Sequence, residues 1–356
     1  MSTLIITTIQ PDLHWENKAA NLQSLEEKIL GIREKTELVI LPEMFSTGFS
    51  MKPEILAEGM DGPTVNWMKK VAAQKRIILT GSLIIEENGR YYNRLIWMLP
   101  NGQLGVYDKR HRFAYAGEHD HYTAGQKRLI ASVKGWRVNL QVCYDLRFPV
   151  WSRQSPPGEG SESVGFLAEE TRQGKTPVSE REEEIPDTDV EPGTRPLNDP
   201  PFNGPALDHS SRAPQTPTQT LPKPPPTHSQ SGPPTSSIAH PQPGPSASNP
   251  PPIPEYDLLI YVANWPERRA HAWKTLLQAR AIENQSYTVG VNRVGNDGNN
   301  IYHSGDSMII DPLGEVLYHG SKQEEVFTYT LQKDKLDEVR SRFPFWRDGD
   351  RFSIEP

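Results

Sequence analysis

Three residues of this sequence have side chains that could together break an acyl bond, and each closely follows a predicted strand. Glu43 comes after the strand predicted at 38–41, Lys109 after the strand at 104–107, and Cys143 after 136–142. Functional side chains in α/β proteins gather at the carboxyl ends of strands, so we expect these three to lie close together. Cys143 is also predicted to precede a helix, a setting that exposes a nucleophile beside backbone N–H donors.

A thiol, a carboxylate and an ammonium group suffice for acyl transfer without a histidine. A cysteine thiol has a pKa of about 8.5 and reacts as the thiolate, so it needs a base. Glu43 could take the proton and pass it to a departing nitrogen, while Lys109 would lower the thiol pKa and stabilise the oxyanion. Each residue also has an ordinary interpretation: Glu43 as a charge at a helix start, Lys109 as an exposed ion-pair partner, Cys143 as core.

Proline divides the 356-residue chain into two kinds of sequence. The segment 155–254 holds 24 of the 34 prolines, together with 6 basic and 13 acidic residues, so it alone carries the net charge of -7. It has no apolar periodicity, and we predict a disordered insertion, because such a segment cannot bury enough surface to offset its ordering entropy. Its P-x-x-P stretches could dock to a binding module, but an inert linker is the preferred interpretation.

The insertion falls between a predicted helix and a predicted strand, where a short surface loop would be expected. Loop-closure entropy grows only with the logarithm of loop length, so the flanks can still form one domain. We therefore predict a single discontinuous domain from 1–154 plus 255–356, interrupted by 155–254.

The remaining composition excludes several function classes. Outside the insertion the charges balance and no long basic run occurs, which argues against a nucleic-acid partner. No apolar run is long enough for a membrane span, and a single cysteine fits a reducing, cytoplasmic location. No H-x-x-x-H or C-x-x-C cluster suggests a metal, and we expect no organic cofactor.

Strand-like and helix-like patterns alternate along both flanks, and strand pairs joined by short turns add antiparallel hairpins. This order predicts an α/β fold of stacked sheets covered by helices. The expected helices are 18–34, 63–74, 148–153 and 269–284; the expected strands are 4–9, 38–41, 77–85, 91–99, 104–107, 128–133, 136–142, 256–262, 287–291, 307–310 and 315–318.

Longer segments around the three reactive residues resemble the signature segments of the nitrilase superfamily. They read L-P-E-M-F at 41–45, Y-D-K-R-H at 107–111 and V-C-Y-D-L-R-F-P at 142–149, in the family's order and spacing. Further similarity follows downstream of the insertion, so that the resemblance covers about residues 3–154 and 255–352.

Membership of this superfamily implies a four-layer αββα sandwich that pairs into a homodimer or a higher homo-oligomer. It implies that Glu43 is the general base, Lys109 the oxyanion stabiliser and Cys143 the nucleophile of a thioester acyl-enzyme. Glu118 matches a frequent second glutamate that orients the lysine or assists water, and the backbone N–H of Tyr144 would complete the oxyanion site.

The segments at 143–153 and 261–266 are most similar to bacterial YafV-like omega-amidases. This resemblance implies hydrolysis of 2-oxoglutaramate and 2-oxosuccinamate to the 2-oxo acid and ammonia. Such substrates carry a carboxylate, so we expect a pocket cation, with Arg268 and Arg269 as candidates. Asn264 and Trp265, at the preceding strand end, are further candidates for substrate binding.

Two alternatives remain open. One is another amidase or an N-carbamoyl hydrolase on the same triad, with nitrile hydrolysis less favoured. The other is a non-catalytic dimeric scaffold whose proline-rich segment docks to partners, although a scaffold has no need for all three reactive residues. We further expect Asp145 and Arg147 to form an ion pair near the nucleophile, and the insertion to alter dimerisation or activity.

Overall fold

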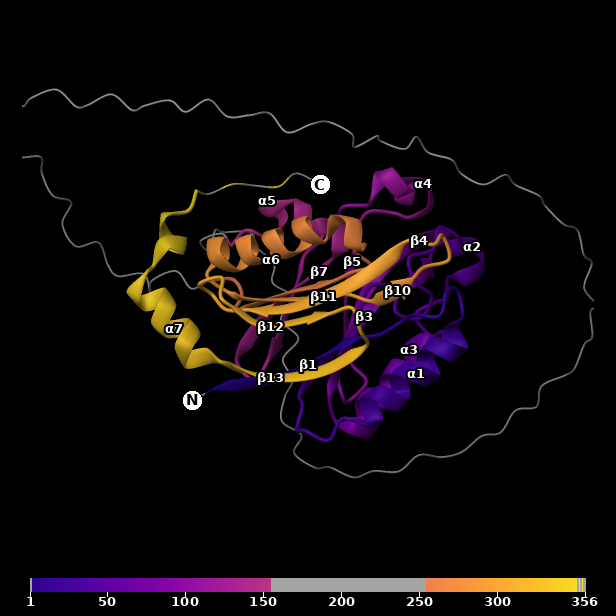
Figure 1. Cartoon of the computed structure of the whole chain (residues 1–356), viewed down its shortest axis with the longest axis horizontal. Coiled ribbons are helices and arrows are strands. Elements are labelled where there is room, and N and C mark those ends of the chain that lie inside the picture. Colours follow the sequence, from indigo (N-terminus) through magenta and orange to yellow (C-terminus); the bar gives the residue numbers. More distant parts are fainter. Residues whose placement is uncertain (1, 155–253, 351, 353, 355–356) are drawn as a thin grey trace, which may run out of the picture. The chain divides into compact units, whose positions relative to one another are not determined.

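The computed structural model describes residues 2–154, 254–350, 352 and 354. The predicted insertion therefore lies outside the described residues, except for Pro254. Two sheets form the centre of the described fold (Figure 1). The first has the order β13 (Glu325–Gln332), β1 (Thr3–Gln10), β2 (Leu38–Ile40), β3 (Ile78–Glu87), β4 (Arg90–Met98) and β5 (Leu104–Asp108).

The second sheet has seven strands, three of which run parallel at its centre. Its order is β10 (Val294–Asn296), β11 (Tyr302–Ile310), β9 (Tyr287–Val291), β8 (Leu258–Val262), β7 (Trp136–Val142) and β6 (Leu129–Val133), with β12 (Val316–Ser321) paired to β11. Strands β7, β8 and β9 are parallel, and β8 and β9 are buried at every position. Near-continuous apolar runs are typical of strands that are covered on both faces.

Helices cover the outer face of each sheet, and side chains from both sheets meet between them. Helices α1 (Lys18–Leu30) and α3 (Pro63–Lys75) share a buried cluster with β2 and β3, while α6 (Ala270–Asn284) packs on β9 and β11. Figure 1 shows α1 and α3 on one side of the strands and α6 on the other. The predicted four-layer αββα sandwich is therefore confirmed.

Between the sheets, alternate residues of each strand point inward. Leu4 and Ile6 of the first sheet join Val138 and Leu140 of the second in one buried cluster. Each such side chain contributes about 2 kcal/mol when fully buried, so this layer holds the two sheets in a fixed relation. The catalytic candidates depend on that relation because they come from both sheets.

Several predicted helix bounds need correction. The helix predicted at 18–34 ends at Leu30, because Gly31 caps it through N–H bonds to the carbonyls of Glu27 and Ile29. The helix predicted at 148–153 is observed as the shorter α5 (Pro149–Ser152), and a 3-10 turn that was not predicted, η2 (Cys143–Arg147), precedes it. Phe148 separates them, since a residue before proline is disfavoured in the helical conformation.

Other elements have no counterpart among the sequence predictions. They are β10, β13, α2 (Pro53–Leu56), α4 (Glu118–His121), α7 (Lys333–Arg342) and the 3-10 turns η1 (Ala114–Ala116), η3 (Glu267–Arg269) and η4 (Phe345–Asp348). Strand β13 pairs antiparallel with β1 along its whole length and completes the first sheet. Among the described residues, no helix combines the length and apolarity needed to cross a bilayer.

The two flanks of the predicted insertion meet at one place. The N–H of Tyr256 donates to Oε1 of Gln154 at 3.4 Å, and the Tyr256 hydroxyl donates to the carbonyl of Ser152. Arg128 binds both carboxylate oxygens of Glu255 at 3.1 Å and also the carbonyl of Arg153. The chain therefore leaves and re-enters the described fold between neighbouring residues.

Candidate active site

Both sheets contribute to the candidate site through strand ends. Glu43 follows β2 and Lys109 follows β5 in the first sheet, while Cys143 follows β7 in the second. The structure brings these side chains together with Glu118, which begins α4, and all four are buried. The predicted convergence of the three reactive residues is therefore observed.

The backbone is left-handed at two positions that carry or adjoin reactive side chains. Cys143 has φ 45° and Met44, directly after Glu43, has φ 43°. Such conformations cost non-glycine residues about 1–3 kcal/mol and persist only where the surroundings enforce them. At Met44 the N–H donates to Oγ of Ser82 at 2.9 Å, which holds the turn that presents Glu43.

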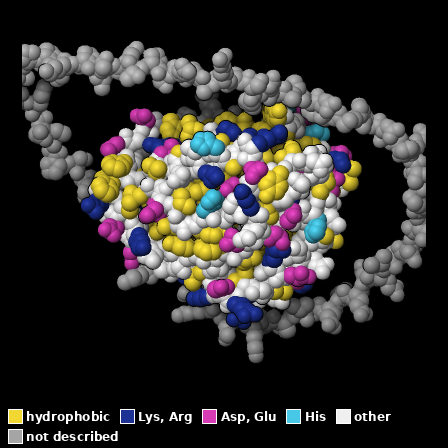
Figure 2. Space-filling model, viewed as in Figure 1, with side chains coloured by type: hydrophobic (Ala, Val, Ile, Leu, Met, Phe, Trp, Pro, Cys, Tyr) yellow, Lys and Arg dark blue, Asp and Glu magenta, His cyan; other side chains and the backbone are white. Residues whose placement is uncertain are grey.

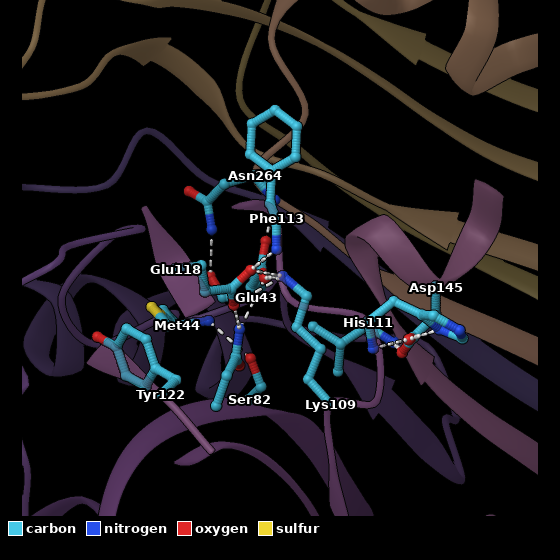
Figure 3. Close-up of polar contacts among 12 residues, drawn as sticks. Glu43, Met44, Ser82, Lys109, His111, Phe113, Glu118, Tyr122, Asp145 and Asn264 are labelled. Carbon is cyan, nitrogen blue, oxygen red and sulfur yellow. Dashed lines mark hydrogen bonds and ion pairs between the residues drawn. The ribbon is translucent and has the colours of Figure 1, made fainter. Parts of the chain in front are cut away.

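The Lys109 ammonium lies between two carboxylates (Figure 3). Its Nζ is 2.9 Å from Oε1 of Glu43 and 2.9 Å from both carboxylate oxygens of Glu118. The Phe49 ring, with its centroid 5.1 Å from Nζ, closes one side. The backbone N–H of Phe113 also donates to Oε2 of Glu118. One cation is thus shared by two buried carboxylates.

Two asparagines hold the glutamates in place. Asn93, in β4, donates from Nδ2 to Oε1 of Glu43 at 2.8 Å and to Oε1 of Glu118 at 3.3 Å. Asn264 donates its backbone N–H to Oε2 of Glu43 at 2.9 Å, and its side-chain amide donates to the Glu43 carbonyl. The Asn264 side chain is therefore hydrogen-bonded to the backbone of Glu43 and helps to hold that residue in place. Sequence reasoning missed Asn93, because the same strand also contains Arg90 and Arg94 and the asparagine therefore did not stand out.

The Cys143 thiol is neutral in this setting. Burial raises its pKa well above the ordinary value, and the charges of Glu43 and Glu118 outweigh the opposite effect of Lys109. Lys109 does lower the thiol pKa, as expected, but burial first and then the charge of Glu43 raise it by more. The proton must therefore leave for Glu43 as the sulfur attacks.

Lys109 and Glu118 have perturbed pKa values for opposing reasons. Burial lowers the pKa of Lys109, but the Glu118 and Glu43 carboxylates outweigh it, so the pKa lies above its usual range. Burial and the charge of Glu43 raise the pKa of Glu118 despite its contact with Lys109. Lys109 is therefore a permanent cation beside two groups with raised pKa values, the Glu118 carboxyl and the Cys143 thiol.

Asp145 joins the nucleophile turn to the Lys109 loop. Its carboxylate accepts the N–H of Val142 at 3.0 Å, the N–H of His111 at 2.9 Å and the hydroxyl of Tyr107 at 2.7 Å, and it lies 2.8 Å from Nδ1 of His111. The expected ion pair with Arg147 is wrong. The Arg147 guanidinium instead lies over the Trp265 ring, 5.1 Å from its centroid.

The backbone N–H of Tyr144 stays a predicted oxyanion donor, and its place in the fold is compatible with that role. Tyr144 is the second residue of η2, and N–H groups in the first turn of a helix have no acceptor within that helix. Its ring packs against Phe113 and Phe148, with centroid distances of 4.9 and 5.2 Å. An oxygen bound to carbon at the Cys143 sulfur could accept from this N–H and from Lys109.

The other substrate-binding candidates occupy different environments. Trp265 is buried, and its Nε1–H donates to the carbonyl of Arg269 at 2.8 Å. Arg268 is exposed, whereas Arg269 is half-buried with its guanidinium 5.0 Å from the Phe113 ring centroid. Arg269 is also within electrostatic range of the Cys143 sulfur. Of the two arginines, Arg269 is therefore the one connected to the nucleophile turn, through the rings of Phe113 and Tyr144.

Among the described residues, no group of three or more histidine, cysteine, aspartate or glutamate side chains is placed to hold a metal ion. The four reactive side chains instead form a compact proton-transfer unit. It combines a protonated thiol, an adjoining carboxylate, a permanent cation and a second carboxylate. This combination suits acyl transfer from a carbon–nitrogen bond to sulfur.

Comparisons with known proteins agree with this chemistry. The profile of the family described as carbon-nitrogen hydrolase matches residues 5–158 and 254–341. Omega-amidase YafV from Escherichia coli (strain K12) is 32% identical over 355 residues, covering 99% of this chain and 100% of the relative. 2-Oxoglutaramate amidase from Bacillus subtilis (strain 168) is 23% identical and aligns over 96% of both chains.

A solved structure shares the fold over the full length. The crystal structure of XC1258 from Xanthomonas campestris, a CN-hydrolase superfamily protein with an arsenic adduct in the active site, has a TM-score of 0.72 and 33% identity, covering 100% of both chains. The profile match spans more than half of the sequence on both flanks of the predicted insertion. The chain thus belongs to the carbon–nitrogen hydrolase family, within the nitrilase superfamily.

Proposed function

We propose that this hydrolase is an omega-amidase that cleaves the terminal amide of 2-oxo dicarboxylic acid monoamides such as 2-oxoglutaramate and 2-oxosuccinamate. The observation that carries the proposal is the buried cluster of Cys143, Glu43 and Lys109, in which the Lys109 ammonium donates to Oε1 of Glu43 at 2.9 Å and the Glu43 charge raises the pKa of the thiol. The full-length similarity to omega-amidase YafV supports the amide class, and the similarity to the 2-oxoglutaramate amidase of Bacillus subtilis supports the 2-oxo acid.

Acylation begins with proton transfer from the Cys143 thiol to Glu43 as the sulfur bonds to the amide carbon. The carbonyl electron pair moves to oxygen, where Lys109 and the Tyr144 N–H stabilise the negative charge. When the carbonyl re-forms, the carbon–nitrogen bond breaks and Glu43 returns the proton to the leaving nitrogen. The products of this step are ammonia and a thioester on Cys143.

Deacylation repeats these steps with water as the nucleophile. Glu43 takes a proton from water as its oxygen attacks the thioester carbon, and the same two donors stabilise the oxyanion. Collapse breaks the carbon–sulfur bond, releases the carboxylic acid and returns the proton to sulfur. Glu118 keeps Lys109 in place through two bonds of 2.9 Å, so that the cation serves both steps.

Ammonia release from 2-oxoglutaramate, measured beside glutamine and a nitrile, tests the proposal. We expect turnover of 2-oxoglutaramate to exceed that of the other two, and Cys143→Ala to lower kcat by about 10⁴-fold or more. Persistent activity in Cys143→Ala would overturn the mechanism. Preference for an N-carbamoyl compound would favour the alternative hydrolase, and no activity on any of these compounds would favour the scaffold.

We also propose that the chain assembles as a homodimer through the layer that contains α5 and α6. This layer exposes two large apolar side chains, Val150 at 53% and Ile282 at 54%. Replacing both with serine should shift a dimer towards monomer in size-exclusion chromatography with light scattering. A wild-type chain that is monomeric at micromolar concentration would contradict the proposal.

A further inference from the structure

Arg269 is held beside the reactive thiol by contacts that leave its guanidinium free to bind a ligand. It ends η3, directly before α6, and its carbonyl accepts the indole N–H of Trp265 at 2.8 Å. Its guanidinium stacks over Phe113 and lies within electrostatic range of the Cys143 sulfur. The backbone is fixed by Trp265 and the side chain by an aromatic ring.

No carboxylate lies within ion-pair distance of this guanidinium in the described part of the chain. Its electrostatic neighbours are instead the cations Arg268 and Arg147, the Cys143 thiol and the Tyr115 hydroxyl. Burial, followed by the repulsion of these two arginines, lowers the pKa of Arg269 from its ordinary value. Half-burying a guanidinium among like charges is unfavourable unless a ligand compensates it.

Other buried arginines of this protein have acidic partners. Arg94 binds Asp108 at 2.7 Å, Arg293 binds Asp12 at 2.8 Å, and Arg340 binds Asp257 at 2.8 Å. Arg280 likewise binds Glu283 at 3.0 Å. The fold therefore pairs these fully buried guanidinium groups with carboxylates, and the half-buried Arg112 and Arg153 bind backbone carbonyls. The half-buried guanidinium of Arg269 has neither kind of partner among the described residues, and it stacks on Phe113 next to the nucleophile turn. That position indicates an anionic ligand that arrives with the substrate.

We propose that Arg269 binds the carboxylate of the substrate and thereby selects amides that carry a distal negative charge. This inference rests on the proposed function, since it assigns the acid group of the same substrate. Guanidinium groups recognise carboxylates through two parallel N–H donors, which fixes orientation as well as charge. Anchored at one end by Arg269, the substrate would present its amide carbon to Cys143.

Phe113 links this carboxylate receptor to the catalytic cluster. Its ring lies beneath the Arg269 guanidinium, and its backbone N–H donates to Glu118. The ring also contacts Tyr144, whose N–H is the second oxyanion donor. One loop residue therefore sets the position of the anchor relative to the groups that perform acyl transfer.

The matched probe pair is 2-oxoglutaramate and 4-oxopentanamide, in which a methyl group replaces the carboxylate. For Arg269→Gln we expect kcat/KM for 2-oxoglutaramate to fall by about 100-fold, mostly through KM, because a charge-paired contact is lost. The rate on 4-oxopentanamide should stay unchanged. Arg269→Lys should restore part of the loss, since it keeps the charge but not the paired donors.

The exposed neighbour provides the matched control. Arg268→Gln removes the same charge one residue away, and we expect it to change KM by less than about threefold, as for a solvent-screened charge. Equal losses in the two variants, or an Arg269→Gln loss that is the same for both probes, would overturn the assignment. The first result would indicate a diffuse charge effect and the second a structural role.

A binding measurement separates this inference from the proposed reaction. Cys143 is the single cysteine, so the rate of alkylation by iodoacetamide reports on this site alone. We expect 2-oxoglutarate to protect Cys143, and Arg269→Gln to require at least about tenfold more for the same protection. Protection that depends on Arg269 without ammonia release from 2-oxoglutaramate would reject the proposed substrate and retain the anchor. If wild type and Arg269→Gln release ammonia with equal KM and are protected equally, the proposed substrate is retained and the carboxylate anchor is rejected.

Discussion

Two buried charge clusters in this protein have opposite compositions. At the candidate active site, the carboxylates of Glu43 and Glu118 share one cation, Lys109. The second cluster lies at the opposite, amino ends of the second sheet's parallel strands, where Asp257 directly precedes β8. Its single carboxylate faces three cations. They are Arg137 at 2.9 Å, Arg340 at 2.8 Å and Lys333 at 3.3 Å.

The two clusters shift pKa values in opposite directions. Burial raises the pKa of Asp257, but its basic neighbours outweigh this effect and bring the pKa below its usual value. Burial and like charge instead raise the pKa of Glu118 and of the Cys143 thiol. An excess of cations fixes a carboxylate in one protonation state, whereas a deficit keeps protons available for transfer. The first arrangement stabilises the fold, and the second prepares chemistry.

Removing Glu43 should produce the largest effect. Glu43→Gln is expected to lower kcat by about 10⁴-fold, because the base that receives the thiol proton is lost. The pKa of Cys143 should fall at the same time, since the Glu43 charge no longer raises it. The pH dependence of iodoacetamide alkylation measures this pKa. An unchanged or higher value would contradict the charge-deficit account of the site.

Removing Asp257 should affect stability and leave chemistry intact. Asp257→Asn leaves three cations without their carboxylate, and we expect a loss of about 3–5 kcal/mol in the free energy of unfolding. Urea denaturation monitors this loss, while kcat per folded molecule should stay at the wild-type value. A large fall in kcat with normal stability would show that the two clusters are not functionally distinct.

Removing Glu118 should lower kcat and leave stability almost unchanged, which is the converse of the effect expected for Asp257→Asn. Glu118→Gln is expected to lower kcat by about 100-fold, because Lys109 loses its orienting partner. The free energy of unfolding should change by less than about 1 kcal/mol, because a carboxylate with a raised pKa is costly to ionise in the fold. Kinetics and urea denaturation of the same sample provide the comparison with Asp257→Asn.

Acid titration distinguishes the clusters by the sign of their pKa shifts. The pKa of Asp257 is lowered from 3.8, so its contribution to stability is present above that value and lost as pH falls through the folded-state pKa. We expect wild-type stability to decline below pH 3.8 more steeply than that of Asp257→Asn. Parallel acid-denaturation curves for the two proteins would contradict the assignment.

Shortening the segment between Gln154 and Glu255 to a brief glycine-serine turn tests a third region, which belongs to neither charge cluster. The flanks already meet through Tyr256 and Arg128, so we expect a gain of about 2 kcal/mol from the lower loop-closure entropy. Light scattering and ammonia release on the same protein test whether the segment alters assembly or rate. Unchanged values for both would reject that hypothesis.

The sequence predicted the positions of the reactive residues better than their electrostatics. The strand predicted at 136–142 is observed with those bounds, and the spacing of Glu43, Lys109 and Cys143 indicated their convergence. The effect of Lys109 on the thiol pKa has the expected direction, but the net shift depends on how deeply the sulfur is buried, which spacing cannot supply. The same holds for Asp145, whose partner His111 comes from another strand end.

The elements that were missed have weak local signals. Strand β13 is largely half-exposed or exposed, so its apolar positions do not form a continuous run, and its place is decided by pairing with β1. Helix α7 has only two buried residues, Leu336 and Arg340. Tertiary contacts determine such elements, and a single sequence contains little information about them.

The pairing of β1 with β13 has a consequence for the timing of synthesis. Strand β1 lies between β2, which leads to Glu43, and β13, which the ribosome makes last among the strands. A nascent chain therefore holds β1 with one edge unpaired during most of its translation. We expect hydrolytic activity to arise only after β13 has emerged from the ribosome, and the unfinished sheet to be the species on which chaperones act.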